Sequence, residues 1–242
     1  LLADTIHNFS DALTAIPLGL AFWLSRRARN KRYTYGYGRA EDIAGVIIVL
    51  MIAFSAFEAI YQSIYKIIHP EPINHLGWVA AAAIIGFIGN EMVAVFRIRV
   101  GQEIGSAALV ADGYHARTDG FTSLAVLAGA LGVWLGFPLL DPIIGLGIGV
   151  AILGIVWQSA REMWHRVMDA VDPGIYEEFK HTTSHVPGVM DVHSAAIRWV
   201  GHRLWGEIHV TVNCKQPTWQ SHLIVEEVRH ALFHSFPALV EV

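Results

Sequence analysis

Two short stretches of the chain hold the side chains best suited to chemistry. His7 and Asp11 are four positions apart, and His115 and Asp119 repeat the same spacing. In an α-helix, side chains at i and i+4 lie on one face, so each stretch places an imidazole beside a carboxylate. Together the two stretches offer two nitrogen and two oxygen donors, which is a complete four-ligand set for a divalent metal such as zinc.

Both stretches lie in apolar sequence. The chain has 242 residues, of which 54% are hydrophobic and 16% charged, whereas about a quarter of the residues in an ordinary soluble domain are charged. An ionisable side chain at mid-helix costs about 2.5–3.5 kcal/mol in a membrane, and such residues are functional by default. A metal site inside a membrane indicates transport. Five segments approach or exceed the ~20 residues that span a hydrocarbon core, at about 1–25, 41–67, 76–97, 105–135 and 138–165.

The connections between these segments alternate in charge. The first, 26–39, is rich in Arg and Lys, and the third, 97–104, contains Arg97 and Arg99, while the second and fourth contain neither residue type. The positive-inside rule therefore places the loops 26–39 and 97–104 and the C-terminal part of the chain in the cytoplasm. Residue 1 would then lie toward the far side, so we expect one more helix upstream.

The C-terminal part reads as a small separate domain. The triplet Asp172-Pro173-Gly174 disfavours helix continuation, and the pattern after it predicts helix, strand, strand, helix and strand. We predict a transmembrane cation-transport domain over 1–168, with its first helix missing, and a cytoplasmic metal-binding and dimerisation domain over 169–242, with its last strand truncated. The expected fold class is an α-helical transmembrane bundle, five helices visible of six, followed by a small αββαβ domain of the ferredoxin or metallochaperone type.

Several polar residues have simpler explanations that compete with a metal site. For the His/Asp quartet, the alternative is an ion-pair network in which Arg117 neutralises a carboxylate. Asp112 is better suited to a supporting or structural role than to direct ligation, and Glu58 and Glu91 could each relay protons or pair with a neighbouring helix. In the C-terminal part, His222, Glu226, His230 and His234 share one helical stripe that is either a solvated face or a metal patch.

The paired cassettes, the loop Tyr35-Gly-Tyr-Gly-Arg-Ala-Glu41 and the αββαβ domain resemble the cation diffusion facilitator family of zinc transporters. The resemblance covers essentially the whole chain and begins at what would be the second transmembrane helix of the family. It implies a homodimer that exports Zn²⁺, often also Cd²⁺ or Co²⁺, in exchange for protons, with Zn²⁺ also as a regulatory ion. The transport ligands it implies are His7, Asp11, His115 and Asp119.

The resemblance also implies details outside the transport site. His193, His209 and His222 match positions of a cytoplasmic metal site, whose closing His-x-Asp segment would fall beyond Val242. Asn30 and Tyr37 stand where some members bind a further zinc, so we predict that this loop site is absent. Arg39 is expected to pair with Asp169 across the dimer. The short 97–104 loop lacks a His-rich insertion, which favours a prokaryotic plasma membrane.

Other classes of protein fit less well. A formal net charge of −4 gives no reason to expect nucleic-acid binding, and the single cysteine, Cys214, excludes an intramolecular disulfide and a Cys-rich zinc site. An intramembrane metalloenzyme would need an open coordination position and a motif such as His-Glu-x-x-His, which is absent, so we do not expect an enzyme. A membrane metal sensor remains as an alternative, and ion flux would distinguish it from a transporter.

Overall fold

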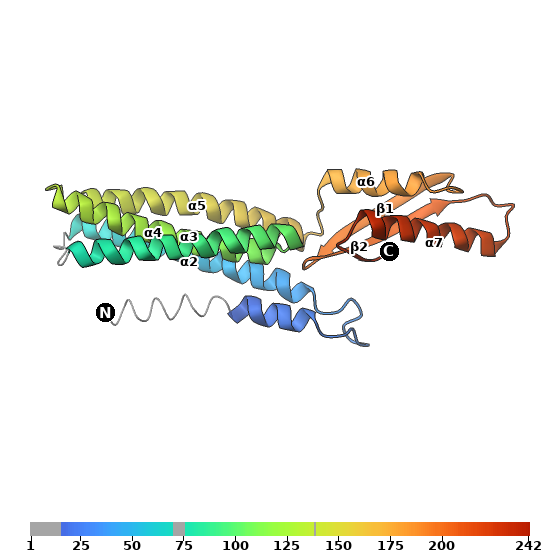
Figure 1. Cartoon of the computed structure of the whole chain (residues 1–242), viewed down its shortest axis with the longest axis horizontal. Coiled ribbons are helices and arrows are strands. Elements are labelled where there is room, and N and C mark those ends of the chain that lie inside the picture. The colour runs from blue at the N-terminus through green and yellow to red at the C-terminus, as the bar shows by residue number, and fades with distance from the viewer. Residues whose placement is uncertain (1–15, 70–75, 138) are drawn as a thin grey trace.

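The computed structural model describes residues 16–69, 76–137 and 139–242. His7 and Asp11 lie outside the described residues. Four long helices form a bundle: α2 (Arg39–Ile68), α3 (Leu76–Ile104), α4 (Ala107–Trp134) and α5 (Leu140–Val167). The bundle is extended by a small C-terminal domain at one end (Figure 1). A shorter apolar helix, Ile16–Ser25, precedes α2.

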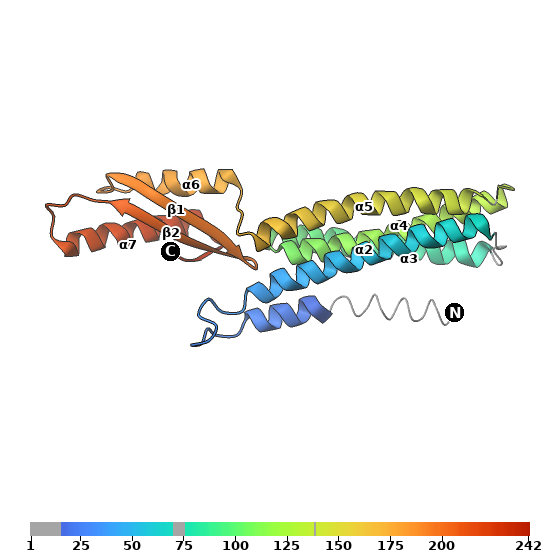
Figure 2. The ribbon, with the colours of Figure 1, turned by 180° about the vertical axis from the view of Figure 1, so that it is seen from behind.

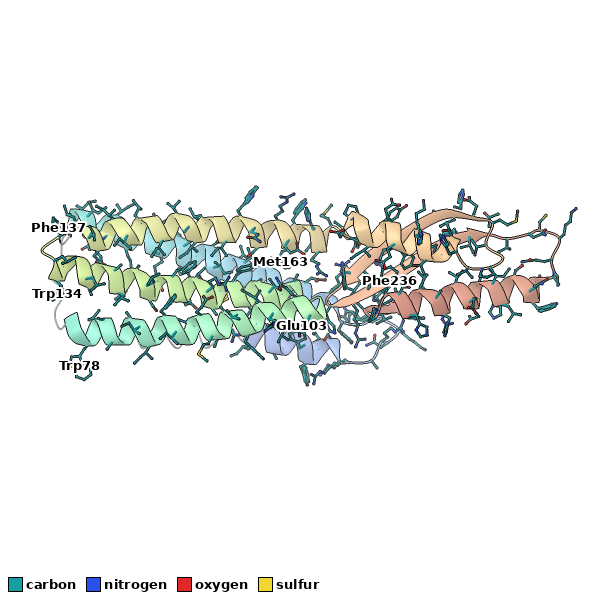
Figure 3. The ribbon with its side chains drawn as sticks, turned by 45° about the horizontal axis from the view of Figure 1, so that its top comes forward. Trp78, Glu103, Trp134, Phe137, Met163 and Phe236 are labelled. Atoms are coloured by element: carbon teal, nitrogen blue, oxygen red, sulfur yellow. The ribbon has the colours of Figure 1, made fainter. Side chains whose placement is uncertain are left out.

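The long helices have the dimensions of membrane spans. Each contains 28 to 30 residues, which at about 1.5 Å per residue exceeds the ~30 Å of a hydrocarbon core. Arg39–Ile68, Gly77–Ile104 and Leu140–Val167 are long and apolar enough to cross a membrane. Trp78, Trp134 and Phe137 lie at the end away from the C-terminal domain (Figure 3), where aromatic side chains suit a membrane interface.

The third connection differs from the expected loop over 97–104. Helix α3 continues through these residues to Ile104, so the prediction of a loop there is wrong. Gly101 allows this continuation, because it packs directly against the backbone of Ser106 and Val110 at the start of α4. The turn is reduced to Gly105, with a positive φ of 72°, and to Ser106, whose Oγ accepts a hydrogen bond from the Leu109 N–H.

The bundle core is made of small and branched side chains. Ile48, Ile52 and Ala56 of α2 are completely buried, as is Ile152 of α5, and they pack with the small face of α4 that includes Ala108 and Ala111. The close packing places α4 in contact with α2, α3 and α5. Side chains on its inner faces are therefore surrounded by protein.

The C-terminal domain has the expected αββαβ order. Its elements are α6 (Pro173–Ser184), β1 (Asp191–Val200), β2 (Arg203–Thr211), α7 (Thr218–Ser235) and β3 (Leu239–Glu241). The sheet order is β1-β2-β3; β2 pairs antiparallel with β1 and parallel with β3. Phe179 of α6, Leu204 of β2 and Leu232 of α7 meet in its core. A helical bundle followed by a small α+β domain confirms the predicted fold class.

Candidate cation site

Helix α4 positions His115 and Asp119 on the same inner side of the bundle. His115 exposes 3% of its surface, and Asp119 is half-buried. Asp119 lies fourteen residues from the turn at Gly105, which corresponds to a depth of about 21 Å along the helix. The hydroxyls of Thr122 and Ser123 donate to the Asp119 carbonyl oxygen, at 2.8 and 3.1 Å, so the backbone here is surrounded by polar groups.

The neighbouring cations are engaged with other carboxylates. Arg117 forms two hydrogen bonds with Glu91 of α3, from Nη2 to Oε1 at 2.8 Å and from Nε to Oε2 at 3.3 Å. Arg97 lies 2.9 Å from Asp112 Oδ2, measured from its Nη1. The alternative in which Arg117 neutralises a carboxylate therefore applies to Glu91. Asp112 has the structural partner expected of a residue one turn from the cassette.

A cavity of about 380 Å³ lies beside the cassette, between α2, α4 and α5. Asp119 lines it together with Glu58 and Gln62 of α2. The cavity also reaches Lys66 and Asp141, which pair through Nζ and Oδ2 at 3.0 Å. Asp119 is thus next to a space large enough for a hydrated ion, lined by hydroxyl, amide and carboxylate groups.

The three histidines expected at the cytoplasmic metal site are all exposed and lie on different elements. His193 lies on β1 at an irregularity of the strand pairing between Val192 and Ser194, and His222 lies on α7. His209 on β2 contacts Glu207, with 3.1 Å between Nε2 and Oε1. Within the described ranges, no three His, Cys, Asp or Glu side chains are grouped so as to hold a metal ion. This site stays a prediction, as does the quartet that needs His7 and Asp11.

The junction between the bundle and the C-terminal domain contains a buried polar network that sequence reasoning missed. Glu41 of α2 exposes only 1% of its surface; it accepts a hydrogen bond from the Ser106 hydroxyl and lies 2.8 Å from His202 Nδ1. His202 belongs to the turn between β1 and β2, which points toward the bundle (Figure 2). Arg166 of α5 donates to the carbonyl oxygens of Gly105 and Gly201, at 3.1 and 3.3 Å. Its guanidinium ties the bundle to the same turn.

Two further side-chain pairs concern earlier expectations. The pair of Arg39 and Asp169, which we expected across the dimer, forms within one chain in the structure; Arg39 also donates to the Arg166 carbonyl oxygen at 3.0 Å. Asn30 donates from Nδ2 to the Tyr37 hydroxyl at 2.7 Å, so the two residues expected to replace a loop metal site contact each other. The first pair joins the start of α2 to the segment after α5, and the second joins two residues of the first connection.

Comparison with known proteins gives matches along nearly the whole chain. The family model "Cation efflux transmembrane domain" matches residues 1–165, and "Cation efflux protein, cytoplasmic domain" matches residues 171–242. The probable cation efflux system protein Rv2025c of Mycobacterium tuberculosis (strain H37Rv) is 53% identical over 239 residues, which is 99% of this chain and 72% of the relative. The cation-efflux pump FieF of Salmonella schwarzengrund is 28% identical over 98% of this chain and 78% of its own length. The magnetosome protein MamB of Magnetospirillum gryphiswaldense is 26% identical, with 98% and 80% covered.

These matches define the class of protein as a membrane transporter of cations. The chain belongs to the cation efflux, or cation diffusion facilitator, family, as the sequence motifs predicted. Its members are transporters rather than enzymes, which confirms that expectation. The chain is therefore an integral membrane protein that exports cations.

Proposed function

We propose that this chain exports Zn²⁺, and also Cd²⁺ or Co²⁺, by exchange with protons. The transport ligands in this proposal are His7, Asp11, His115 and Asp119. The observation that carries it is the position of His115 and Asp119 on one buried side of α4, with Asp119 at the wall of a polar cavity. A pair of imidazoles with a pair of carboxylates is a donor set that suits zinc and its chemical neighbours.

Proton exchange follows from the chemistry of these ligands. A metal binds neutral imidazole and ionised carboxylate, so protons and Zn²⁺ compete for the same side chains. Imidazole has an unperturbed pKa of about 6.5, close to the pH of cells, which makes it a natural exchange partner. In an alternating-access cycle, zinc loads from the side of the C-terminal domain, and protons displace it on the other side.

The same proposal includes orientation and assembly. The basic residues of the first connection support a cytoplasmic C-terminal domain in a prokaryotic plasma membrane. The family membership of the C-terminal domain supports a homodimer. The proposal also includes a regulatory zinc site at His193, His209 and His222, which are not grouped as metal ligands within the described part of one chain.

The decisive experiment measures Zn²⁺ flux into proteoliposomes that contain the full-length protein, with and without an imposed pH gradient. We expect flux to require the gradient and to vanish in Asp119→Ala, while Arg99→Met, at an exposed position of α3, transports like the parent. Tight Zn²⁺ binding without flux would instead indicate a sensor. His7→Asp should shift preference toward harder ions such as Mn²⁺, since it replaces a nitrogen donor by oxygen; an unchanged selectivity would contradict the ligand assignment.

A further inference from the structure

The polar cavity beside Asp119 extends toward the end of the bundle that lies away from the C-terminal domain. Asp119 lines it at one level, and Lys66 and Asp141 line it at another. Ten residues of α4 separate Asp119 from Gly129, which packs against the Asp141 carboxyl group. At about 1.5 Å per residue, Asp141 therefore lies roughly 15 Å beyond Asp119 along the bundle axis.

Helix α2 supplies polar groups between these two levels. Glu58 is eight residues before Lys66, or about 12 Å along the helix, which places it within about one turn of the depth of Asp119. Gln62 lies one turn further and donates from Nε2 to Glu58 Oε1 at 3.0 Å. A cation that leaves Asp119 in this direction would meet oxygen atoms at every turn until it reaches Asp141.

The pair of Lys66 and Asp141 is asymmetric. The Asp141 side chain is only 12% exposed, and it is held where Gly129 approaches so closely that any β-carbon there would overlap its carboxyl group. The Lys66 side chain is 46% exposed at the end of a flexible chain of methylenes. The carboxylate is fixed in the cavity, while the ammonium can swing away into solvent.

We propose that Lys66 and Asp141 form the exit step of the ion pathway. Asp141 is the carboxylate that a divalent cation meets after it leaves Asp119, and the Lys66 ammonium is the counter-ion that the cation displaces. When no cation is present, the ion pair closes this end of the cavity. The inference rests on the proposed role of Asp119 and on the proposed orientation in the membrane. It adds Lys66 and Asp141 to the ion pathway, which neither of those two proposals requires.

A purely structural role for the pair makes a different prediction. The pair joins α2 to α5, and Gly129 of α4 packs against the same carboxyl group, so the pair could serve only to hold the three helices together. If the pair only holds the helices together, replacing either residue would change the stability of the folded protein. It would not make the accessibility of the cavity depend on the sign of the charges.

The experiment measures access to the cavity with a membrane-impermeant cationic methanethiosulfonate reagent. The chain has one cysteine, Cys214, so Cys214→Ser provides a background in which Ser123→Cys, on the cavity wall, is the only thiol. The full-length protein is labelled in sealed vesicles from the side opposite the C-terminal domain. A separate preparation that retains Cys214, which is exposed in that domain, reports which way the protein inserts under the same conditions.

We expect slow labelling of the thiol at position 123 in the parent, and faster labelling in Lys66→Met and in the isosteric Asp141→Asn. If the pair contributes about 1 kcal/mol to closure, the rate should rise about fivefold. The charge swap Lys66→Asp with Asp141→Lys should restore slow labelling. Zn²⁺ flux should fall in Asp141→Asn and stay low in the swap, because the swap places the ammonium at the buried position in the pathway.

Two matched controls make the result specific. Phe137→Cys places the thiol at an exposed position outside the cavity lining, at the same end of the bundle (Figure 3), and its labelling should not respond to Lys66→Met. Arg99→Met removes a cation near the other end of α3, and it should leave labelling of the thiol at position 123 unchanged. Unchanged labelling in Lys66→Met, or a charge swap as fast as the single variants, would overturn the proposal. Because labelling requires neither zinc nor protons, it can fail while Zn²⁺/H⁺ exchange is upheld, and the reverse.

Discussion

The ion pair of Arg97 and Asp112 allows a sharp prediction about the helix that carries the cassette. Asp112 lies one turn before His115, and its side chain is 2% exposed, whereas that of Arg97 is 27% exposed. The charged atoms are 2.9 Å apart, and at an effective dielectric constant of about 20 their attraction amounts to about 6 kcal/mol. Desolvation offsets part of that attraction, so the measurable quantity is the cost of removing one partner.

We expect Arg97→Met to destabilise the protein by about 3–5 kcal/mol, because it leaves a buried carboxylate without its counter-ion. Within the described residues, Asp112 Oδ1 has no hydrogen-bond partner that could compensate. At roughly 2–4 °C per kcal/mol for a chain of this size, the midpoint of thermal unfolding in detergent should fall by about 6–20 °C. Asp112→Leu should cost less, since the longer Arg97 side chain can reach water.

The double variant Arg97→Met with Asp112→Leu should recover most of the loss, because replacing a buried ion pair by apolar residues is often neutral. Arg99→Met is the matched control: its pair with Glu103 is 3.9 Å long and largely exposed, so its removal should cost less than about 0.5 kcal/mol. If Arg97→Met and Arg99→Met unfold at the same temperature, the pair does not stabilise α4 and the reasoning is refuted.

Two other perturbations test the junction and the C-terminal domain. His202→Ala should weaken the attachment of the β1–β2 turn to the bundle by about 1–3 kcal/mol, because buried Glu41 loses one of its hydrogen-bond partners. The readout is faster backbone hydrogen exchange in residues 200–204, and Arg203→Ala, at the exposed neighbouring position, serves as the control. Phe179→Ala should lower the free energy of unfolding of the C-terminal domain by about 3–5 kcal/mol, since the ring is completely buried and lies 5.5 Å from that of Phe236. Near-ultraviolet circular dichroism should show this domain unfolding at a lower denaturant concentration. A decrease of less than about 1 kcal/mol would contradict the prediction.

Periodicity and charge were sufficient to predict the four long helices α2 to α5 and the αββαβ order. Long apolar runs have few alternatives in a membrane, and the alternation in β2 is clear enough to fix which face is buried. The end of α3 is not predictable from the sequence, because the polar residues after Arg97 are equally typical of a loop that leaves the membrane. In the structure, close contact of Gly101 with α4 continues the helix for two more turns.

The cassette of His115 and Asp119 was visible in the sequence because both residues lie on one helix, where spacing alone decides whether they share a face. The partners of Arg117 and Asp112 were not visible in this way, because they come from α3 and depend on how two helices are aligned. The same holds for Glu41 and His202, which are 161 positions apart. Sequence spacing can identify what one element presents, but it cannot align separate elements.

The junction connects the C-terminal domain to the helix that carries His115 and Asp119. The turn at Gly105 and Ser106 starts α4, and it is bound by Arg166 of α5 and by Glu41 of α2, which in turn contacts His202 of the C-terminal domain. A displacement of the β1–β2 turn would therefore act on the start of the helix that carries His115 and Asp119. Three long helices and the hairpin meet at this point around the buried carboxylate of Glu41 and the partly buried guanidinium of Arg166. Hydrogen bonds through Glu41 thus connect the C-terminal domain to the start of α4, and His202→Ala should remove one of them without replacing His115 or Asp119.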